Sequence, residues 1–252
     1  MLDTAQQTTL ARDGFINAGP VLAPEDLAEI TSEYDQLVTP GTQVLGNERD
    51  GFFPYRAMLN FRSPALAAFV LHPSLVSIAR QLLGDDVRFW WDQGINKSPG
   101  AGSFIPWHQD NGYEHGRIPE YFTFWLALDD STLGNGGLEV LPGSHREGFQ
   151  EHEWAGAHAT LSPRHPKVEE AIPLDAQAGD LLVFSSLLVH QTVGNRSHDR
   201  QRRAWVIQYC RGDARNAVTG EVYDNRPWVV RRGTPQTTLR SERRFDLRSD
   251  RP

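Results

Sequence analysis

The sequence predicts a mainly β protein with helices flanking the sheets on the N-terminal side. Helical patterns are confined to about the first third of the 252 residues. From residue 86 onward, short segments rich in β-branched and aromatic residues are separated by Gly, Pro, Asn and Asp. Strands do not alternate with helices as a parallel α/β sheet requires. Helices followed by many strands indicate a helix-buttressed β-sandwich or barrel, and without a repeat or linker we expect one domain over residues 1–252.

Three segments in the helical part, about residues 1–85, predict helices. Residues 22–38 have a proline near the start, acidic residues in the first turn and apolar residues at helical spacing. Residues 64–71 and 73–84 predict two more helices, the second ending at a glycine. Residues 39–61, rich in turn-formers, predict a long loop, and loops of this length often bind ligands or act as lids.

Five segments in the β part, about residues 86–230, predict strands because they are short, apolar and bounded by turn-forming residues. They are residues 87–98, 121–130, 137–144, 180–193 and 202–210. The stretch from Arg231 to Arg251 is Arg-rich but interrupted by acids, so we expect a solvated or partner-contacting tail.

Composition excludes several classes of protein. An apolar fraction of 39% is typical of a globular chain. A net charge of −7 without a basic, aromatic stripe argues against nucleic-acid binding. Cys210 is the only cysteine and lies in an apolar run, which indicates a buried strand residue in a reducing compartment. No signal peptide or membrane-spanning stretch is visible, so we expect a soluble, cytoplasmic protein.

The segment PWHQDNGY contains a His-x-Asp pair, His108 and Asp110. If it lies on a strand, both side chains point to the same side. Downstream, His190 ends a strongly apolar strand. Two histidines and one carboxylate can occupy one face of an octahedral iron, and the lack of cysteine ligands argues against structural zinc. The alternative is a polar turn and an ordinary core imidazole.

Two arginines, Arg202 and Arg203, begin the next predicted strand. A guanidinium near the metal would hold a dicarboxylate cosubstrate through a bidentate pair. Because neighbouring strand residues face opposite ways, only one of them can point inward. Either could instead be a surface charge.

Six segments, in order, resemble the phytanoyl-CoA dioxygenase-like family of Fe(II)- and 2-oxoglutarate-dependent oxygenases, which includes ectoine hydroxylases. They are DQGINKSPGAG, PWHQDNGY, FWLALDD, GNGGLEVLPGSHREG, AGDLLVFSSLLVHQTVGNRS and RRAWVIQY, covering roughly residues 86–210. The Asp-Gly-Phe at Asp13 and the later LAPEDL also fit. The resemblance implies a double-stranded β-helix core (jelly-roll, cupin-like) that uses Fe(II), 2-oxoglutarate and O2.

The resemblance also implies roles for single residues. His108, Asp110 and His190 match the iron ligands, and Arg202 matches the 2-oxoglutarate partner. Arg202 lies one residue further from His190 than is usual in the family, which leaves Arg203 as an alternative. Further positions match residues near the cosubstrate: Thr192, Gln93, Lys97, Gln109 and Trp125.

The other histidines have simpler interpretations. His145, in the PGSH segment, is expected to stabilise a tight turn. His152, His158 and His165 fall in a polar, proline-containing stretch and are expected on the surface.

The resemblance implies hydroxylation of a small-molecule metabolite, with a natural-product intermediate as one option and with release of succinate and CO2. Asp110 favours hydroxylation over halogenation, while desaturation, cyclisation and epimerisation stay open. Alternatives are a cupin-type metal enzyme without 2-oxoglutarate and a non-catalytic binding module on this fold. Residues expected to line a substrate pocket, or else to pack in the core, are Phe53, Tyr55, Arg56, Trp91, Phe104, Tyr113 and Trp228. Among these, Arg56 would contact a carboxylate or phosphate.

Overall fold

The computed structural model describes residues 1–38, 55–156, 158–161 and 165–244, and in this part of the chain two antiparallel sheets dominate. The larger sheet has the order β1-β10-β5-β12-β3-β13-β14, with β2 paired to β3, and the smaller has the order β4-β11-β6-β9. The larger sheet comprises β1 (Phe15–Pro20), β2 (Tyr55–Ala57), β3 (Val87–Lys97), β5 (Phe122–Ala127), β10 (Asp180–Ser185), β12 (Arg202–Arg211), β13 (Trp228–Arg231) and β14 (Thr234–Arg240). The smaller sheet comprises β4 (Ile105–His108), β6 (Leu138–Val140), β9 (Ile172–Leu174) and β11 (His190–Thr192). A separate hairpin comprises β7 (His152–Ala155) and β8 (His158–Leu161).

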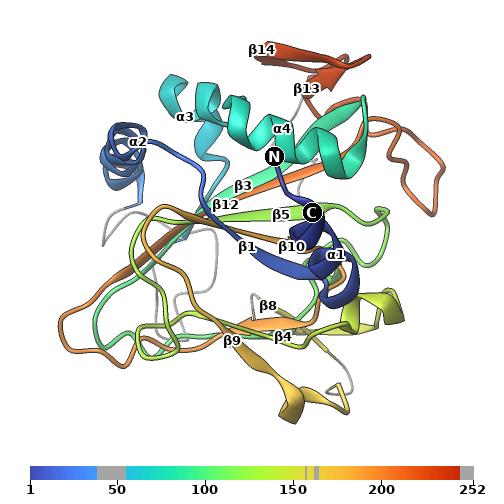
Figure 1. Cartoon of the computed structure of the whole chain (residues 1–252). Helices are drawn as coiled ribbons and strands as arrows, with labels where there is room; N and C mark the ends of the chain where they lie inside the picture. Colours follow the sequence, from blue (N-terminus) through green and yellow to red (C-terminus); the bar gives the residue numbers. More distant parts are fainter. Residues whose placement is uncertain (39–54, 157, 162–164, 245–252) are drawn as a thin grey trace.

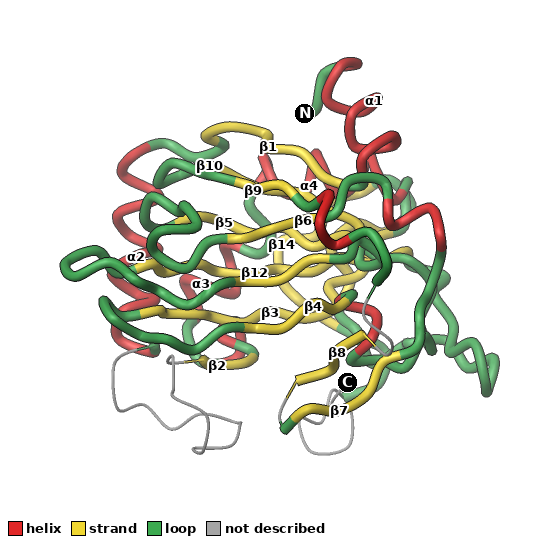
Figure 2. Tube along the Cα trace, turned by 90° about the horizontal axis from the view of Figure 1, so that it is seen from below, coloured by secondary structure: helices red, strands yellow, loops and turns green. Residues whose placement is uncertain are grey.

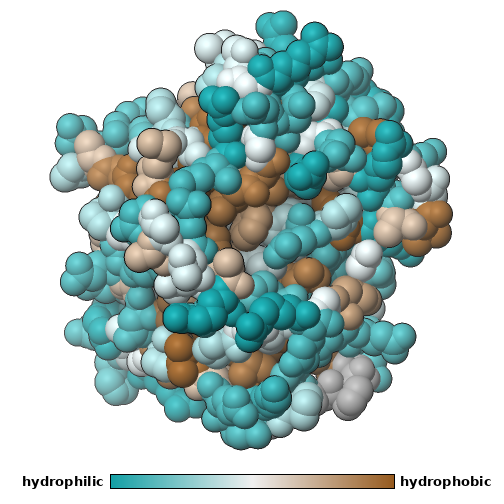
Figure 3. Space-filling view, turned by 45° about the vertical axis from the view of Figure 1, so that its right-hand side comes forward, coloured by the Kyte–Doolittle hydropathy of each residue, from teal (hydrophilic) through white to brown (hydrophobic). Residues whose placement is uncertain are grey.

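Helices α2, α3 and α4 cover the face of the larger sheet that is turned away from the smaller one (Figure 1). The helices are α1 (Thr4–Asp13), α2 (Pro24–Leu37), α3 (Pro64–Phe69) and α4 (Pro73–Leu83). Short 3₁₀ helices are η1 (Leu59–Phe61), η2 (Asp110–Gly112), η3 (Ser144–Glu147) and η4 (Val168–Glu170). This is the mainly β, jelly-roll architecture that was predicted, with helices at the N-terminal side. Outside, the face in Figure 3 is largely hydrophilic, with hydrophobic side chains gathered between the polar ones.

Strand β12 shows how alternation sorts side chains between two cores. Trp205 and Ile207 pack in the core between the larger sheet and the helices. Ala204 and Val206 pack in the core between the two sheets. Because side chains alternate along a strand, Arg202 belongs to the inner face and Arg203 to the helix-covered face.

Three helices and most strands lie where the sequence predicts them, and four features differ. Helix α1 has few apolar residues, and its signal is the capping box between Asp3 and Gln6. Strands β1 and β2 lie inside the part that was expected to be helical and join β10 and β3.

The segment 180–193, predicted as one strand, forms two strands in different sheets. The turn between them is closed by Leu188 N–H donating to Ser185 O. At the C-terminal side, the stretch expected to be a solvated or partner-contacting tail includes β14, which is mostly exposed but pairs with β13. Both differences reflect tertiary pairing that local pattern does not encode.

Candidate metal centre and cosubstrate site

Three side chains converge in the space between the sheets: His108 at the end of β4, Asp110 at the start of η2, and His190 at the start of β11. We call them the His-Asp-His cluster. One potential ligand atom from each lies within 4.8 Å of the others. Asp110 Oδ1 is 3.6 Å from His108 Nε2 and 3.7 Å from His190 Nε2. The two histidines are direct partners in the β4–β11 ladder, which is what brings them together.

Two expectations about this cluster were wrong in detail. Asp110 is not on the strand of His108; the chain turns into η2 after Gln109. His190 does not end the long apolar strand but begins β11 in the other sheet.

Backbone carbonyls orient both imidazoles. His108 Nδ1 lies 2.7 Å from Pro106 O, and His190 Nδ1 lies 2.9 Å from Leu188 O. A carbonyl can only accept, so each Nδ1 carries the hydrogen and each Nε2 lone pair is left for a metal. This carbonyl-held arrangement is typical of metal-ligating histidines.

The two oxygens of the Asp110 carboxylate have different partners. Its Oδ2 accepts hydrogen bonds from Thr123 Oγ1 at 2.5 Å and from Gln208 Nε2 at 3.1 Å. Its Oδ1 faces the two histidines. Thr123 and Gln208 lie on β5 and β12 of the larger sheet, so the opposite sheet positions this carboxylate.

Electrostatics keep Asp110 and His190 in the protonation states that metal binding needs. Burial raises the pKa of Asp110, but its interactions with His108 and His190 outweigh this effect, and the pKa lies below its usual range. Burial lowers the pKa of His190 to about 4. A carboxylate and a neutral imidazole are the forms that bind metal, and two nitrogens with one oxygen suit Fe(II).

Arg202 and Lys97 place two positive charges in the same interior, on adjacent strands at paired positions. Arg202 is fully buried; its Nε and Nη2 donate to Gly136 O at 3.0 and 2.6 Å, and its Nη1 has no partner among the described residues. Lys97 Nζ donates to Thr192 Oγ1 at 2.7 Å and to Val193 O at 2.5 Å. Burial lowers the pKa of Arg202 to about 10 and that of Lys97 well below its usual range. A dianionic ligand would stabilise the charged forms of both side chains.

Arg203 lies on the other face and is already paired. Its guanidinium donates to both carboxylate oxygens of Asp129 and to Asp35 of α2, at 2.7 to 2.9 Å. These bonds raise the pKa of Arg203, because they favour its charged form. Within the described residues, geometry therefore favours Arg202 over Arg203 for a cosubstrate carboxylate.

Of the other predicted cosubstrate neighbours, Trp125 and Gln93 belong to the inner face and Gln109 does not. Trp125 is buried, with the Arg202 guanidinium 5.5 Å from its ring. Gln93 pairs with Val206 on β12, an inner-face residue. The Gln109 amide turns away from the cluster, because its Nε2 donates to Gly148 O and Leu187 O.

The predicted substrate residues divide into two groups. Tyr55 and Trp91 both donate to Gln93 Oε1, and Tyr113 packs edge-on against His108 with ring centroids 5.4 Å apart. These three stay candidates for the pocket.

The remaining substrate candidates have other surroundings or lie outside the described residues. Arg56 is on the helix-covered face and donates to Leu37 O of α2. Trp228 lies on β13, and its ring stacks against the guanidinium of Arg88 on β3. Strand β13 pairs with the end of β3 that is opposite to Lys97. Phe104 is 57% exposed. Phe53 lies outside the described residues.

The expectation that three histidines lie on the surface was wrong for His165, while His152 and His158 are half-buried. His165 is buried and contacts Glu147 at 3.0 Å. His152 lies on β7, and its Nε2 accepts from the Gln109 N–H at 2.9 Å, so the hairpin contacts the segment between His108 and Asp110 (Figure 2). His158 is half-buried on β8.

His145 follows Ser144 in η3, and Ser144 Oγ donates to Leu141 O as the turn interpretation expected. Sequence reasoning missed Thr123, Gln208 and Gly136, which support Asp110 and Arg202. Strand parity was the available signal, since Gln208 lies an even number of residues after Arg202 on the same strand.

Comparison with known proteins decides the family. The phytanoyl-CoA dioxygenase (PhyH) family model matches residues 10–204. This chain belongs to the phytanoyl-CoA dioxygenase family. It is 35% identical over 201 residues to phytanoyl-CoA dioxygenase 1 of Oryza sativa subsp. japonica, covering 73% of this chain and 72% of that one. It is 31% identical over 220 residues to an ectoine dioxygenase of Nocardia farcinica, covering 75% and 72%.

A solved structure shares the fold of this family member. The crystal structure of EvdO2 from Micromonospora carbonacea var. aurantiaca, complexed with 2-oxoglutarate, has a TM-score of 0.74 and 23% identity over 88% of this chain and 95% of that one. Family and cluster together make the protein an Fe(II)- and 2-oxoglutarate-dependent oxygenase, with O2 as the second cosubstrate. The two alternative functions, a cupin-type enzyme and a non-catalytic module, are thereby set aside. No helix in the described part of the chain is long and apolar enough to cross a membrane.

Proposed function

We propose that His108, Asp110 and His190 are the three protein ligands of the iron. The observation that carries this is the convergence of two carbonyl-oriented Nε2 atoms on one carboxylate oxygen, Asp110 Oδ1. Three ligands on one face of the metal leave positions for the cosubstrate and oxygen.

Arg202 holds the far carboxylate of 2-oxoglutarate in this proposal, with Lys97 and Thr192 beside it. The support is the buried Arg202 guanidinium, whose Nη1 has no partner among the described residues. A charge of this kind is costly to bury without a counter-ion, and a carboxylate would satisfy it through charge-assisted hydrogen bonds. Asp35 and Asp129 already engage Arg203, so it serves the fold in this proposal.

The reaction we propose is hydroxylation of a small-molecule metabolite. Iron held by His108, Asp110 and His190, with 2-oxoglutarate held by Arg202, would supply the O2 chemistry in which one oxygen atom enters a C–H bond of the substrate and the other enters succinate, with loss of CO2. In this proposal, Tyr113, packed edge-on against His108, and Trp91, which donates to Gln93, orient the substrate and exclude water. A relative named for ectoine supports a small substrate.

The test has two stages. Under anaerobic conditions, Fe(II) and 2-oxoglutarate added to the protein should produce a visible charge-transfer band, and His108→Ala should abolish it. A succinate-release screen over candidate metabolites should then find one that stimulates turnover in the wild type and not in His108→Ala. A full-strength band in His108→Ala would overturn the ligand assignment, and stoichiometric product without 2-oxoglutarate would overturn the reaction.

A further inference from the structure

The side-chain amide of Gln93 is held in one orientation on the inner face of the larger sheet, where Gln93 pairs with Val206. Its Oε1 accepts hydrogen bonds from Trp91 Nε1 at 3.0 Å and from Tyr55 Oη at 2.8 Å. An indole N–H can only donate, so the atom that faces Trp91 has to be the amide oxygen. A tyrosine hydroxyl can donate or accept and would fit either end of the amide. Trp91 is therefore the residue that decides which end of the amide points away from it.

The other end of this amide carries two N–H donors that have no partner among the described residues. The hydrogen bonds of the Gln93 side chain in this part of the chain are the two that Oε1 accepts. Gln93 is half-buried, and Nε2 is not one of the fully buried side-chain atoms that lack a partner, so a ligand can reach it. A fixed pair of donors suits an oxygen acceptor, such as a carboxylate or a keto group.

The register of β3 and β12 places Gln93 between the His-Asp-His cluster and the buried cations. Trp91 pairs with Gln208, whose amide supports the carboxylate of the cluster. Lys97 pairs with Arg202 at the other end of the ladder. Strand residues rise about 3.3 Å each, so the backbone of Gln93 lies roughly 7 Å from the first pair and roughly 13 Å from the second. A ligand that spans the two ends would pass Gln93 near its metal-side end.

We propose that Trp91 is a positioning residue for 2-oxoglutarate, because it holds the Gln93 amide with its N–H donors toward an oxygen at the metal-side end of the cosubstrate. A flipped amide would turn its own oxygen toward that oxygen, and two acceptors repel each other. Tyr55 adds a second bond to the held amide but does not select its orientation. The inference rests on the proposed function in one respect: the cosubstrate lies between the His-Asp-His cluster and Arg202.

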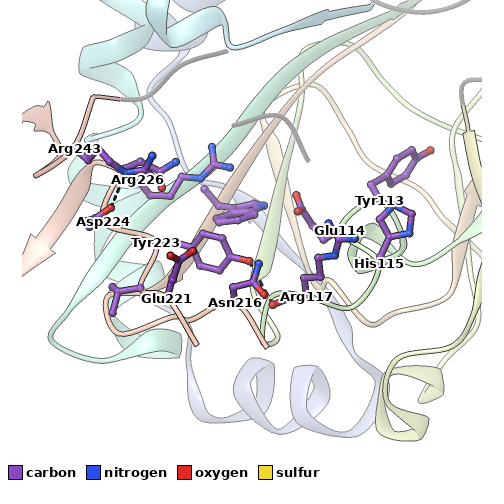
Figure 4. A pocket seen from close by; sticks show the side chains of 13 residues that line it. Tyr113, Glu114, His115, Arg117, Asn216, Glu221, Tyr223, Asp224, Arg226 and Arg243 are labelled. Atoms are coloured by element: carbon purple, nitrogen blue, oxygen red, sulfur yellow. Dashed lines mark hydrogen bonds and ion pairs between the residues drawn. The ribbon is translucent and has the colours of Figure 1, made fainter. Parts of the chain in front are cut away.

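A neighbouring tryptophan provides a matched control. Trp90 precedes Trp91 on β3, is also buried, and gives a hydrogen bond to Glu114. Glu114 is 8% exposed, and burial raises its pKa to about 7. Trp90 and Glu114 line a cavity of about 730 Å³ (Figure 4), and among the residues described as its walls are neither Trp91 nor Gln93. Trp90→Phe therefore removes an indole N–H from the same strand and leaves the bonds of the Gln93 amide in place.

Anaerobic titration of the full-length, Fe(II)-loaded protein with 2-oxoglutarate, followed by the charge-transfer band, measures the affinity. Trp91→Phe should weaken binding about tenfold, because the amide can then turn and donate to Tyr55, and the bond to the cosubstrate is lost. Tyr55→Phe should weaken binding by only about twofold, since Trp91 still selects the orientation. Trp90→Phe should stay within about twofold of the wild type, because its bond is made elsewhere.

A double-mutant cycle separates orientation from packing. Gln93→Met keeps a side chain of similar length and removes the amide, and it should weaken binding about tenfold by itself. Trp91→Phe then has no orientation left to disturb, so adding it to Gln93→Met should change the affinity by less than about twofold. A tryptophan that only packs would cost the same in both backgrounds.

A further variant keeps the inference falsifiable if Trp91→Phe does not fold. Gln93→Glu preserves an oxygen for Trp91 and Tyr55 and places a second oxygen where Nε2 was. That oxygen would face the cosubstrate, so Gln93→Glu should bind 2-oxoglutarate more weakly than Gln93→Met. Equal or tighter binding by Gln93→Glu would overturn the inference.

Two other results would also overturn it: binding by Trp91→Phe as tight as by Trp90→Phe, or an equally large loss from Trp91→Phe in the Gln93→Met background. In either case a normal wild-type band would leave the proposed function standing. Absence of the band in the wild type would instead overturn the proposed function, and this inference with it.

Discussion

Lys97 Nζ donates a hydrogen bond to Thr192 Oγ1 at 2.7 Å, from the larger sheet to the smaller. Lys97 ends β3 opposite Arg202 on β12, while Thr192 lies two residues after His190 on β11. One contact thus joins the strand that carries a proposed iron ligand to the strands that carry the buried cations. It places the proposed cosubstrate carboxylate site at a fixed distance from the metal centre.

Replacing Lys97 by Met should keep the side-chain volume and remove the charge. We expect the affinity for 2-oxoglutarate to fall about tenfold, the loss of one charge-assisted hydrogen bond. Titration of the charge-transfer band with 2-oxoglutarate measures it. Lys167→Met changes the other lysine, which is exposed, and should leave the titration as in wild type. Equal curves for the two variants would mean that Lys97 only supports the sheets.

Arg202→Ala and Arg203→Ala should fail in different ways. Arg202→Ala should raise the KM for 2-oxoglutarate by tenfold or more, because the variant lacks the charge proposed to hold the far carboxylate. Arg203→Ala should lower the free energy of unfolding by about 1–3 kcal/mol and leave that KM nearly unchanged, because it removes contacts with Asp129 and Asp35. Steady-state kinetics and urea unfolding separate the two, and an exchange of these phenotypes would assign the cosubstrate to Arg203.

Thr123→Val and Gln208→Leu should loosen Asp110 without removing a ligand. Each takes away one hydrogen bond to Oδ2, and outer-shell losses of this kind typically cost 10–100-fold in metal affinity. Competition with a chelator gives the Fe(II) affinity. Thr8→Val, at an exposed helical position, should have no effect. Wild-type affinity in both site variants would show that the backbone alone orients Asp110.

Asp92 should make stability depend on pH. It is buried under the helices, where it accepts hydrogen bonds from Trp205 Nε1 and the Asn60 N–H, and burial raises its pKa from 3.8 to about 7. The folded state therefore binds more protons than the unfolded state between these values. Its contribution favours folding most at low pH and is lost as pH rises from about 4 to 7, by up to ~1.4 kcal/mol per pH unit.

Asp92→Asn should remove that dependence. Relative to wild type, the variant should gain stability as pH rises through this interval. Urea unfolding at pH 4.5 and at pH 7.5 measures this, because the difference in unfolding free energy between variant and wild type should change by up to ~1.4 kcal/mol for each pH unit of the interval. Glu114 is unchanged in both proteins, so its own raised pKa cancels in the comparison. A difference that does not vary with pH would mean that Asp92 is ionised throughout.

Local sequence pattern was enough to predict the fold class and the candidate site residues of this chain. Period-two alternation and turn residues are encoded within a few positions, so most strands were predictable. The His-x-Asp pair and a later histidine likewise indicated the three residues of the His-Asp-His cluster. Neither the split of residues 180–193 between two sheets nor the pairing of β14 could be predicted, because strand pairing depends on distant partners.

Tertiary structure alone decided which arginine faces the interior, what anchors Asp110, and that Glu114 is buried beside a cavity. Arg202 and Arg203 are neighbours of the same residue type, and only the packing of α2 against one face of β12 gives Arg203 its carboxylate partner Asp35. The physical reason is that burial and charge pairing belong to surfaces brought together by folding. A residue's neighbours in the sequence do not report them.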